Sequence, residues 1–248
     1  MRKLLRPRDY IVVTLGILGD TFEEIKDPFA IQEKGYKYLY GWVPERWQKH
    51  NFQRSVERML KTGDIEKIIT SGQPVIRLSS QGKDKWTREF PLFTLSLKPW
   101  DGWWRMVGFD IPNILKGKRE SLREKIERLG MGRLQESLYI TPFDFGIDLR
   151  EFIESHGLSS FVDVFEARHT FGQDPRDLAW RVWQLEKLEE RYEGLLSSVM
   201  NKDTLIRKER FQLQVKFEEI ILDDPLLPKE LLPRNWVGYK VYNLVLNR

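Results

Sequence analysis

A nearly continuous apolar run lies at residues 103–111, between a Pro-Trp-Asp-Gly break and a proline. In an extended chain, Val107 and Phe109 would lie on one side and Trp104 and Met106 on the other, because successive side chains of a strand alternate between its faces. Strands that are apolar on both sides are typical of sheet centres with both faces covered. The pattern therefore predicts a central strand at 103–111 with both faces buried.

The residues that follow alternate between helical and extended patterns. Apolar residues at helical spacing cover 115–129, and short apolar runs at 138–140 and 161–167 predict strands. Between these two strands, Asp148 is expected to cap a short helix. An extra strand at 131–135 would complete the order βαββαβ, which is that of the ferredoxin-like split βαβ sandwich.

The first 98 residues show the order of three helices followed by a hairpin. Helical spacings occur at residues 10–18, after Asp27-Pro28, and after Asn51, which we expect to be the N-cap of the third helix. Two short strands at 64–69 and 75–78 follow. This order predicts a winged-helix module.

The third of these helices has a basic face opposite its apolar one. At 100° per residue, Arg54, Arg58 and Lys61 cluster within about 60° of one another, and Gln53 and Ser55 flank them. A short helix of this kind fits the major groove of double-stranded DNA. The sequence leaves open a second interpretation, in which the stripe is only a solvated basic face.

Positive charge is concentrated in the same part of the chain. Residues 1–98 contain 18 Lys/Arg and 12 Asp/Glu, whereas residues 99–248 contain 23 Lys/Arg and 25 Asp/Glu. The predicted hairpin adds Lys67 and Arg77, which we expect to contact DNA phosphates. A polyanionic partner would therefore bind the first 98 residues.

The last part of the chain, residues 173–248, is predicted to be helical. Asp174-Pro175 provides an N-cap and a first-turn proline, and a helical stripe continues from there to Val199. Further helices are expected at 204–222 and 236–246, separated by a segment with three prolines. The predicted fold class is α+β, with a winged helix at 1–98, a ferredoxin-like domain at 99–172 and a helical C-terminal domain at 173–248.

The composition narrows the function classes. The chain has no cysteine, which excludes disulfides and thiolate metal sites and fits a cytoplasmic protein. No apolar run approaches the roughly 20 residues of a membrane helix, and the polar N-terminus does not resemble a signal peptide. The three histidines are scattered, and neither a nucleophile elbow nor a dinucleotide-binding loop is present. We therefore expect no catalytic residue, cofactor or resident metal, and no membrane partner.

Several motifs together carry a resemblance to a known family. They are Trp100-Asp101-Gly102 with Trp104-Arg105 and Phe109-Asp110-Ile111-Pro112, then Leu134-Gln135 with Ser137-Leu138-Tyr139-Ile140, and, most specific, Asp224-Pro225-Leu226-Leu227-Pro228 with Leu231-Leu232-Pro233 and Trp236-Val237-Gly238. On these residues the whole chain resembles the PaaX family, the repressors of phenylacetic acid catabolism and their relatives. The resemblance implies the same three-part build and a transcriptional repressor, usually a homodimer, whose DNA binding is relieved by an aryl-CoA effector.

Four residues near the start of the helical part would suit such an effector. Arg168 and His169 follow the last predicted strand, and Trp180 and Arg181 lie on the next helix. Guanidinium groups bind phosphates, and aromatic side chains line sites for planar acyl groups. The alternative is that the tryptophans of this helix, Trp180 and Trp183, pack against neighbouring elements.

The sequence leaves two other functions open. The ferredoxin-like part also resembles the small CRISPR-associated nucleases of that fold, in which an aspartate ends the first strand, and Asp110 occupies that position. One carboxylate per protomer would hold a metal only across a dimer, and a simpler hypothesis is that Asp110 caps a turn or pairs with an arginine. A protein-interaction scaffold without a nucleic-acid role is the third function.

Overall fold

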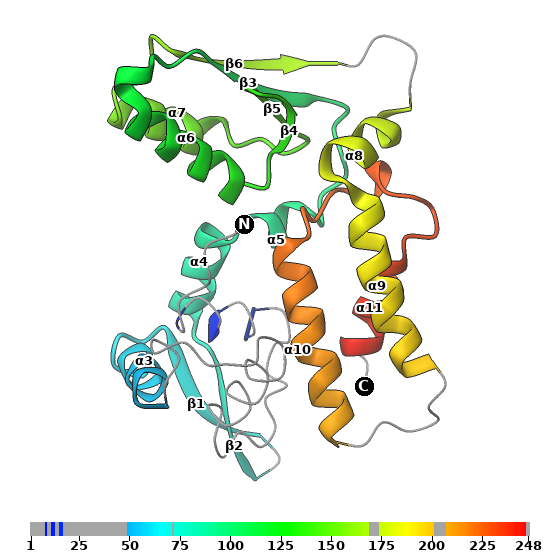
Figure 1. The fold of residues 1–248 in the computed structure, drawn as a ribbon. Helices are drawn as coiled ribbons and strands as arrows, with labels where there is room; N and C mark the ends of the chain where they lie inside the picture. Colours follow the sequence, from blue (N-terminus) through cyan, green and yellow to red (C-terminus); the bar gives the residue numbers. More distant parts are fainter. Residues whose placement is uncertain are drawn as a thin grey trace. The chain divides into compact units, whose positions relative to one another are not determined.

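The computed structural model contains helices and two antiparallel sheets, so the α+β class is confirmed (Figure 1). It describes residues 8, 11–12, 15–16, 49–70, 72–168, 174–200 and 207–246. Of the helices predicted before residue 49, residues 11, 12, 15 and 16 are described and are helical. The rest of those two helices lies outside the described residues.

The chain forms two compact units. One combines Met1–Pro91 with Leu195–Asp223 and Lys240–Arg248, and the other combines Leu92–Gly194 with Asp224–Tyr239. Helices α9 (Leu185–Met200) and α11 (Val237–Leu246) therefore each contribute residues to both units. The three-domain division expected from the sequence remains a prediction.

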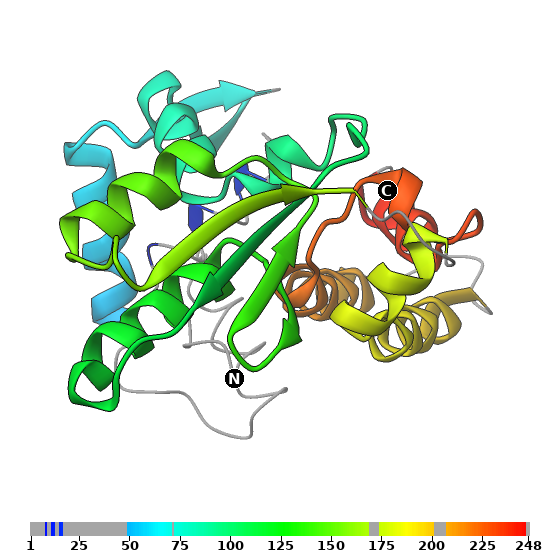
Figure 2. The same ribbon diagram turned by 90° about the horizontal axis from the view of Figure 1, so that it is seen from above.

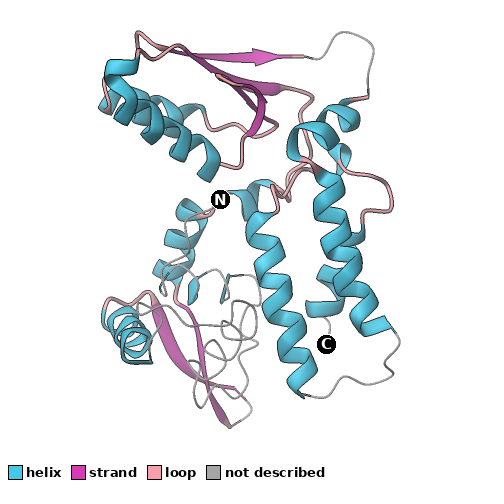
Figure 3. Cartoon of the chain, in the orientation of Figure 1, coloured by secondary structure: helices cyan, strands magenta, loops and turns pink. Residues whose placement is uncertain are grey.

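Residues 49–89 of the first unit form a helix, a hairpin and a second helix (Figure 3). Helix α3 (Lys49–Lys61) is followed by the antiparallel strands β1 (Ile65–Thr70) and β2 (Gln73–Leu78) and by α4 (Ser80–Glu89). The strands pair over their whole length, which leaves a two-residue turn that contains Gly72 at a φ of 78°. Glycine is favoured there because it adopts this left-handed conformation without a steric penalty.

An apolar cluster holds these elements together. Its buried members are Ile11, Val12, Leu15, Met59, Ile65 and Leu78. Val56 and Leu60 of α3 pack against it as partly buried residues. The apolar face predicted for α3 is therefore confirmed, and it lies against the hairpin.

The remaining described part of this unit is helical. Helix α10 (Arg207–Asp223) buries Leu213, Phe217, Ile220 and Ile221. The ring of Phe217 meets Tyr242 of α11 edge-on, with 6.0 Å between ring centroids. The helices predicted at 204–222 and 236–246 are thus confirmed to within a few residues. No helix in the described stretches is long and apolar enough to cross a membrane.

The second unit contains a four-stranded antiparallel sheet in the order β4-β5-β3-β6. After the short helix α5 (Leu92–Leu95), its elements are β3 (Trp104–Phe109), η2 (Asn113–Leu115), α6 (Lys116–Arg128), β4 (Gly132–Gln135), β5 (Leu138–Thr141), α7 (Gly146–Ser155) and β6 (Val162–Ala167). Apart from the one-turn elements, this is the βαββαβ order expected from the sequence, including the extra strand β4.

Helices α6 and α7 lie on the same side of this sheet, below it in Figure 1 and behind it in the view from above in Figure 2. Val107 of β3 and its neighbour in register, Tyr139 of β5, are buried against that side. They share one apolar cluster with Leu122 and Ile126 of α6 and Leu149 of α7. The central strand therefore has one fully covered face.

Among the described residues, helix α8 (Pro175–Trp183) covers one end of the opposite face of the sheet. There Trp183 stacks on Trp104 with 6.1 Å between ring centroids, and a side chain on Gly132 would clash with Trp183. Farther along, Met106 is half-buried and Phe165 of β6 is 53% exposed. The expectation that both faces of the central strand are buried is wrong for this part, because α8 reaches the end near Trp104 while α6 and α7 take the other face.

Three predicted helix limits are also wrong. Helix α3 begins at Lys49, so Asn51 lies inside it rather than capping it. Helix α7 begins at Gly146, before Asp148, and the Asp144 carboxylate accepts the N–H of Gly146 at 2.9 Å. The single stripe predicted from residue 174 to 199 is two helices, since Gln184 has a φ of 50° and ends α8.

The capping role of Asp174 is confirmed, because its carboxylate accepts the N–H of Arg176 at 2.9 Å. The proline-rich segment after α10 is held by Asp224, which is buried and accepts hydrogen bonds from the Tyr192 hydroxyl and the Leu226 N–H, each at 2.7 Å. Burial raises the pKa of Tyr192, and the neighbouring Asp224 charge raises it further. The most specific sequence motif of the chain therefore fastens this segment to α9.

Candidate nucleic-acid interface

The polar side chains predicted for DNA binding on α3 face solvent. Gln53, Arg54, Arg58 and Lys61 are exposed, and Ser55 is half-buried. Because the opposite side of the helix packs into the apolar cluster, these side chains share the face that points away from the core. The predicted basic face of α3 is therefore present as a surface.

The three cations of this face keep their charges uncompensated within the described residues. There, no carboxylate forms an ion pair with Arg54, Arg58 or Lys61. Arg58 and Lys61 also lie in the last turn of α3, where the partial negative charge of the helix end favours cations. Unpaired guanidinium groups of this kind suit phosphates and the edges of guanine.

The two cations predicted for the hairpin differ from each other. Lys67 is exposed, and no described carboxylate forms an ion pair with it. Arg77 instead donates from Nε to Oε1 of Glu66 at 2.7 Å, because these residues are direct partners in the β1–β2 register. Glu66 therefore fixes the direction of the Arg77 side chain across the hairpin.

An internal ion pair fixes the corner between α3 and β1. Lys85 of α4 donates to Asp64 at 2.5 Å, and the Thr62 hydroxyl donates to the other carboxylate oxygen at 2.9 Å. Burial by itself raises the pKa of Asp64, whose side chain is 8% exposed. The hydrogen bonds from Lys85 and Thr62 outweigh burial and hold this pKa below its ordinary value of 3.8. The charged carboxylate therefore stabilises the corner that positions the basic face.

Close packing at the same corner requires a glycine. A Cβ on Gly82 of α4 would lie 1.9 Å from the carbonyl oxygen of Asp64. Ser79 caps α4, since its Oγ accepts the N–H of Gly82 at 3.0 Å while its hydroxyl donates to the Gly63 carbonyl. Serine is a preferred N-cap residue, so the sequence predicts the cap at Ser79, and the structure confirms it. The close contact between Gly82 and Asp64 joins residues 18 positions apart and does not follow from a local pattern.

Of the residues predicted for an effector, Arg168 directly follows β6, and Trp180 and Arg181 lie on α8. Arg168 is exposed, and its guanidinium lies over the ring of Trp103 at 4.3 Å from the centroid. On α8, Trp180 is half-buried and Arg181 is exposed. His169 lies outside the described residues. Trp183 takes the packing role, since it stacks on the sheet and its Nε1–H donates to the Gly130 carbonyl at 2.9 Å.

The Trp100-Asp101-Gly102 motif holds a guanidinium in place. Arg105 is 13% exposed, and its two terminal nitrogens donate to both Asp101 oxygens at 2.9 and 2.7 Å. Its Nε donates to Glu166 at 3.0 Å. The hydrogen bond from Arg105 lowers the pKa of Asp101 and outweighs the opposing effect of burial. The motif therefore has a structural role that the sequence alone did not reveal.

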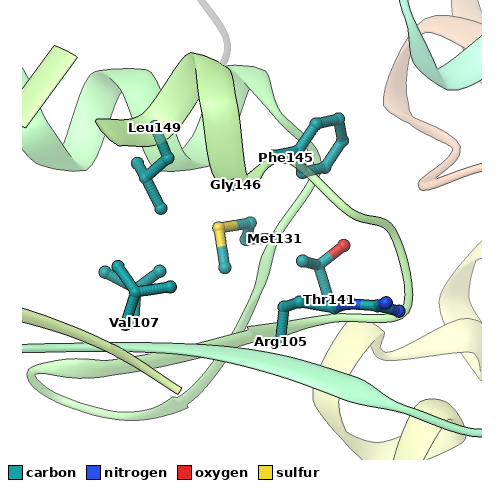
Figure 4. Close-up of a pocket in the computed structure, with 8 residues that line it drawn as sticks. Arg105, Val107, Met131, Thr141, Phe145, Gly146 and Leu149 are labelled. Carbon is teal, nitrogen blue, oxygen red and sulfur yellow. The ribbon is translucent and has the colours of Figure 1, made fainter. Parts of the chain in front are cut away.

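A small cavity lies next to Arg105, between the sheet and α7 (Figure 4). Its lining is mostly apolar and includes Val107, Met131, Phe145 and Leu149. The volume of about 20 Å³ has room for a water molecule but not for an aromatic ring. This cavity is therefore not the site of an aryl group in the present conformation.

Asp110 follows β3 with its side chain exposed. Its backbone N–H donates to the carbonyl of Phe161 at 3.0 Å. Among the residues that the structure describes, no group of three His, Asp or Glu side chains could hold a metal ion. The nuclease alternative therefore gains no support from this site.

The chain matches two family models over consecutive stretches. Residues 97–179 match the PaaX protein central Cas2-like domain, and residues 183–248 match the PaaX-like protein C-terminal domain. A curated relative, the transcriptional repressor PaaX of Escherichia coli (strain K12), is 26% identical over 77% of this chain and 65% of the relative. The chain thus spans slightly less than two thirds of that relative's length.

A solved structure shows a similar fold. An uncharacterized protein from Mycobacterium tuberculosis has a TM-score of 0.56 and 22% identity, over 97% of this chain and 94% of that chain. At this identity the likeness concerns the fold alone. The two family matches adjoin each other, and they contain the motifs that carry the resemblance. The chain belongs to the PaaX family.

Proposed function

We propose that this chain is a transcriptional repressor that binds double-stranded DNA through α3 and the β1–β2 hairpin. The observation that carries the proposal is the exposed face of α3, where Arg54, Arg58 and Lys61 have no described carboxylate partner and the opposite face is packed. The relative named as a transcriptional repressor supports it. The protein would act by occupying its operator and not by catalysis.

In this proposal the first 98 residues form a winged helix. The order α3–β1–β2–α4 and the apolar cluster that these elements share support it. Helix α3 would be the recognition helix, with Gln53, Arg54, Ser55 and Arg58 towards the bases. Lys61, Lys67 and Arg77 would contact phosphates on either side.

We also infer that the chain binds its operator as a homodimer, as the family resemblance implies. Helix α3 has 13 residues and is about 20 Å long at 1.5 Å per residue, so it spans only part of one turn of DNA. Two such helices related by a two-fold axis would read two half-sites about 34–36 Å apart. The operator should therefore be an inverted repeat.

The finer part of the proposal is an aryl-CoA effector that releases the DNA. Arg168, Trp180 and Arg181, with His169, supply guanidinium and aromatic groups on neighbouring stretches of the chain. The stacking of Arg168 on Trp103 supports this, because it places a cation beside an aromatic face at the end of the sheet. A coupling of about 1–3 kcal/mol would change DNA affinity by roughly 5- to 150-fold.

The DNA-binding proposal is tested by selecting duplexes from a randomised pool with the full chain. We expect an enriched inverted repeat, and an affinity for it that falls steeply with salt because cations of the protein displace counterions from phosphates. Enrichment of no sequence, together with salt-independent binding, would contradict the proposal and favour the scaffold alternative.

The effector proposal has its own test. Calorimetry with phenylacetyl-CoA and related thioesters, with and without the selected duplex, should show binding that the duplex weakens, because linkage is reciprocal. Binding of equal strength in both conditions, or no binding, would remove the effector and leave DNA binding standing.

A further inference from the structure

One exposed apolar side chain lies close to the proposed DNA-binding residues. Ile69, near the tip of the β1–β2 hairpin, is 79% exposed. It follows Lys67 by two residues on β1, so both side chains point to the same face of the hairpin. The tip of the hairpin thus presents an isoleucine and an exposed cation side by side.

We propose that Ile69 is a wedge that enters the minor groove of DNA next to the major groove occupied by α3. The inference rests on the proposed function, and it adds how the hairpin holds and bends the duplex. Side chains such as isoleucine are inserted between base steps by proteins that bind the minor groove, and the insertion kinks the duplex. Lys67 provides the charge complement, since both edges of that groove are lined by phosphates.

The length of the hairpin fits this placement. Ile65 is buried in the cluster shared with α3, and Ile69 is four residues farther along the strand, about 13 Å at 3.3 Å per residue. Neighbouring grooves of B-DNA are separated by about half a helical turn, roughly 17 Å along the axis. Ile69 therefore reaches about 13 Å along the strand beyond the cluster that holds α3, which is of the same order as the separation of neighbouring grooves.

The shape of the tip favours a local insertion over a broad contact. The strands pair up to Thr70 and Gln73, so the hairpin closes in a two-residue turn at Gly72. The minor groove is only about 6 Å wide, so the hairpin as a whole does not fit and one side chain has to open the groove. Opening it at that point bends the duplex towards the major groove, which is the side where α3 lies.

Insertion of Ile69 would also favour a particular kind of base step in the operator. An isoleucine offers no hydrogen bonds to base edges, so it distinguishes steps by how easily they unstack. Pyrimidine–purine steps unstack most easily. The operator should therefore carry such a step about half a turn from the bases read by Arg54.

The test uses the full chain and a duplex selected by the wild-type chain from a randomised pool, with a donor and an acceptor dye at its ends. Energy transfer reports bending, and anisotropy reports affinity. The variant is Ile69→Thr, which keeps a β-branched residue suited to a strand and removes the apolar tip. The control is Ile114→Thr, since Ile114 is 92% exposed in η2, far along the chain from the proposed interface.

We expect the wild-type chain and Ile114→Thr to bend the duplex, and Ile69→Thr to leave it nearly straight. The affinity of Ile69→Thr should fall about tenfold, or about 1.4 kcal/mol, with an unchanged salt slope because no charge is removed. Ile69→Met should retain the bend. Lys67→Ala should also retain it while reducing the salt slope by about one unit.

Each other outcome has a definite meaning. Wild-type binding with Ile69→Thr equal to wild type in bend and affinity overturns the wedge and leaves the proposed function intact. Loss of affinity in Ile69→Thr without a bend in the wild-type complex also overturns it. A change of oligomeric state in Ile69→Thr, measured by light scattering, would assign Ile69 to contact with a second copy of the chain. Absence of wild-type DNA binding would refute the proposed function itself.

Discussion

The arginines of α3 and three arginines of the second unit carry the same guanidinium group in opposite surroundings. Arg54 and Arg58 are exposed on α3, with no carboxylate partner among the described residues. In the second unit, Arg105, Arg123 and Arg128 each form an ion pair with at least one carboxylate. The same chemical group is thus available on α3 and occupied at these three positions of the second unit.

This difference separates two uses of positive charge. A paired guanidinium is held in one direction by its carboxylates, and it contributes to the stability of the fold. An unpaired cation on a packed helix leaves its charge and donors for an anion from outside. The excess of positive charge in residues 1–98 therefore becomes informative only when the pairing of each side chain is known.

The largest expected effect is a loss of fold stability when the paired Arg105 is replaced. Replacing Arg105 by alanine removes the donors to Asp101, Glu166 and the Pro142 carbonyl. We expect a fall of about 3 kcal/mol in the free energy of unfolding, because the Arg105 side chain is only 13% exposed and its packing is lost together with several charge-assisted hydrogen bonds. Urea titration measures it. Arg128→Ala is the matched control, since Arg128 is 71% exposed and its ion pair is worth roughly 0.5 kcal/mol or less. Similar effects of both changes would contradict the distinction.

Replacing the unpaired Arg54 by alanine should lower the affinity for DNA and leave the stability of the fold nearly unchanged. We expect about 2 kcal/mol of lost affinity for the selected duplex, since a base contact by arginine is worth that order. The free energy of unfolding should change by less than about 0.5 kcal/mol because the side chain is exposed. Titration against the selected and a scrambled duplex decides the outcome: equal losses on both would assign Arg54 to phosphate contact.

The Asp64–Lys85 pair provides a paired cation inside the proposed DNA-binding module. The pKa of Asp64 is lower in the folded than in the unfolded state, so its charge stabilises the fold above the ordinary value of 3.8. This stabilisation is lost as the pH falls below that value and through the folded pKa. Asp64→Asn should cost about 1.5 kcal/mol at neutral pH, and its stability should approach that of the wild type in acid. A difference that does not shrink with falling pH would show that charge is not the cause.

A smaller effect on DNA affinity is expected from replacing Arg77, because its Nε already donates a hydrogen bond to Glu66. Arg77→Ala should weaken selected and scrambled duplexes equally, by less than about 1 kcal/mol, and reduce the salt slope by about 0.9. Lys67→Ala is the natural comparison on the same hairpin. A loss confined to the selected duplex would place Arg77 at a base edge.

No effect on DNA binding is expected from Asp110→Ala or from EDTA. Asp110 belongs to the second unit and is not one of the residues proposed to contact DNA, and the described residues contain no group of three side chains that could hold a metal ion. Binding is measured after the folded fraction has been checked by circular dichroism. Cleavage of a labelled duplex that needs a divalent metal and disappears in Asp110→Ala would make the nuclease the better interpretation.

Periodicity in the sequence determined which side of each element is apolar. It placed Arg54, Arg58 and Lys61 opposite the packed face of α3, it marked Asp174 as a helix cap, and it gave the βαββαβ order. These features are local, because a helix or strand repeats its faces every few residues whatever lies around it. Helix limits were less well determined, since Asn51 and Asp148 have the chemistry of caps at positions where the helix has already begun.

Only the tertiary structure decided what each face meets. Asp64 finds Lys85 across 21 residues, and Arg105 finds Glu166 across 61, and neither pairing follows from a local pattern. The uncovered end of the sheet around Phe165 has the same cause, since an apolar residue is buried only where another element reaches it. Ile65 and Ile69 are both apolar residues of β1, but Ile65 is 2% exposed and Ile69 is 79% exposed, because Ile69 lies near the tip of the hairpin.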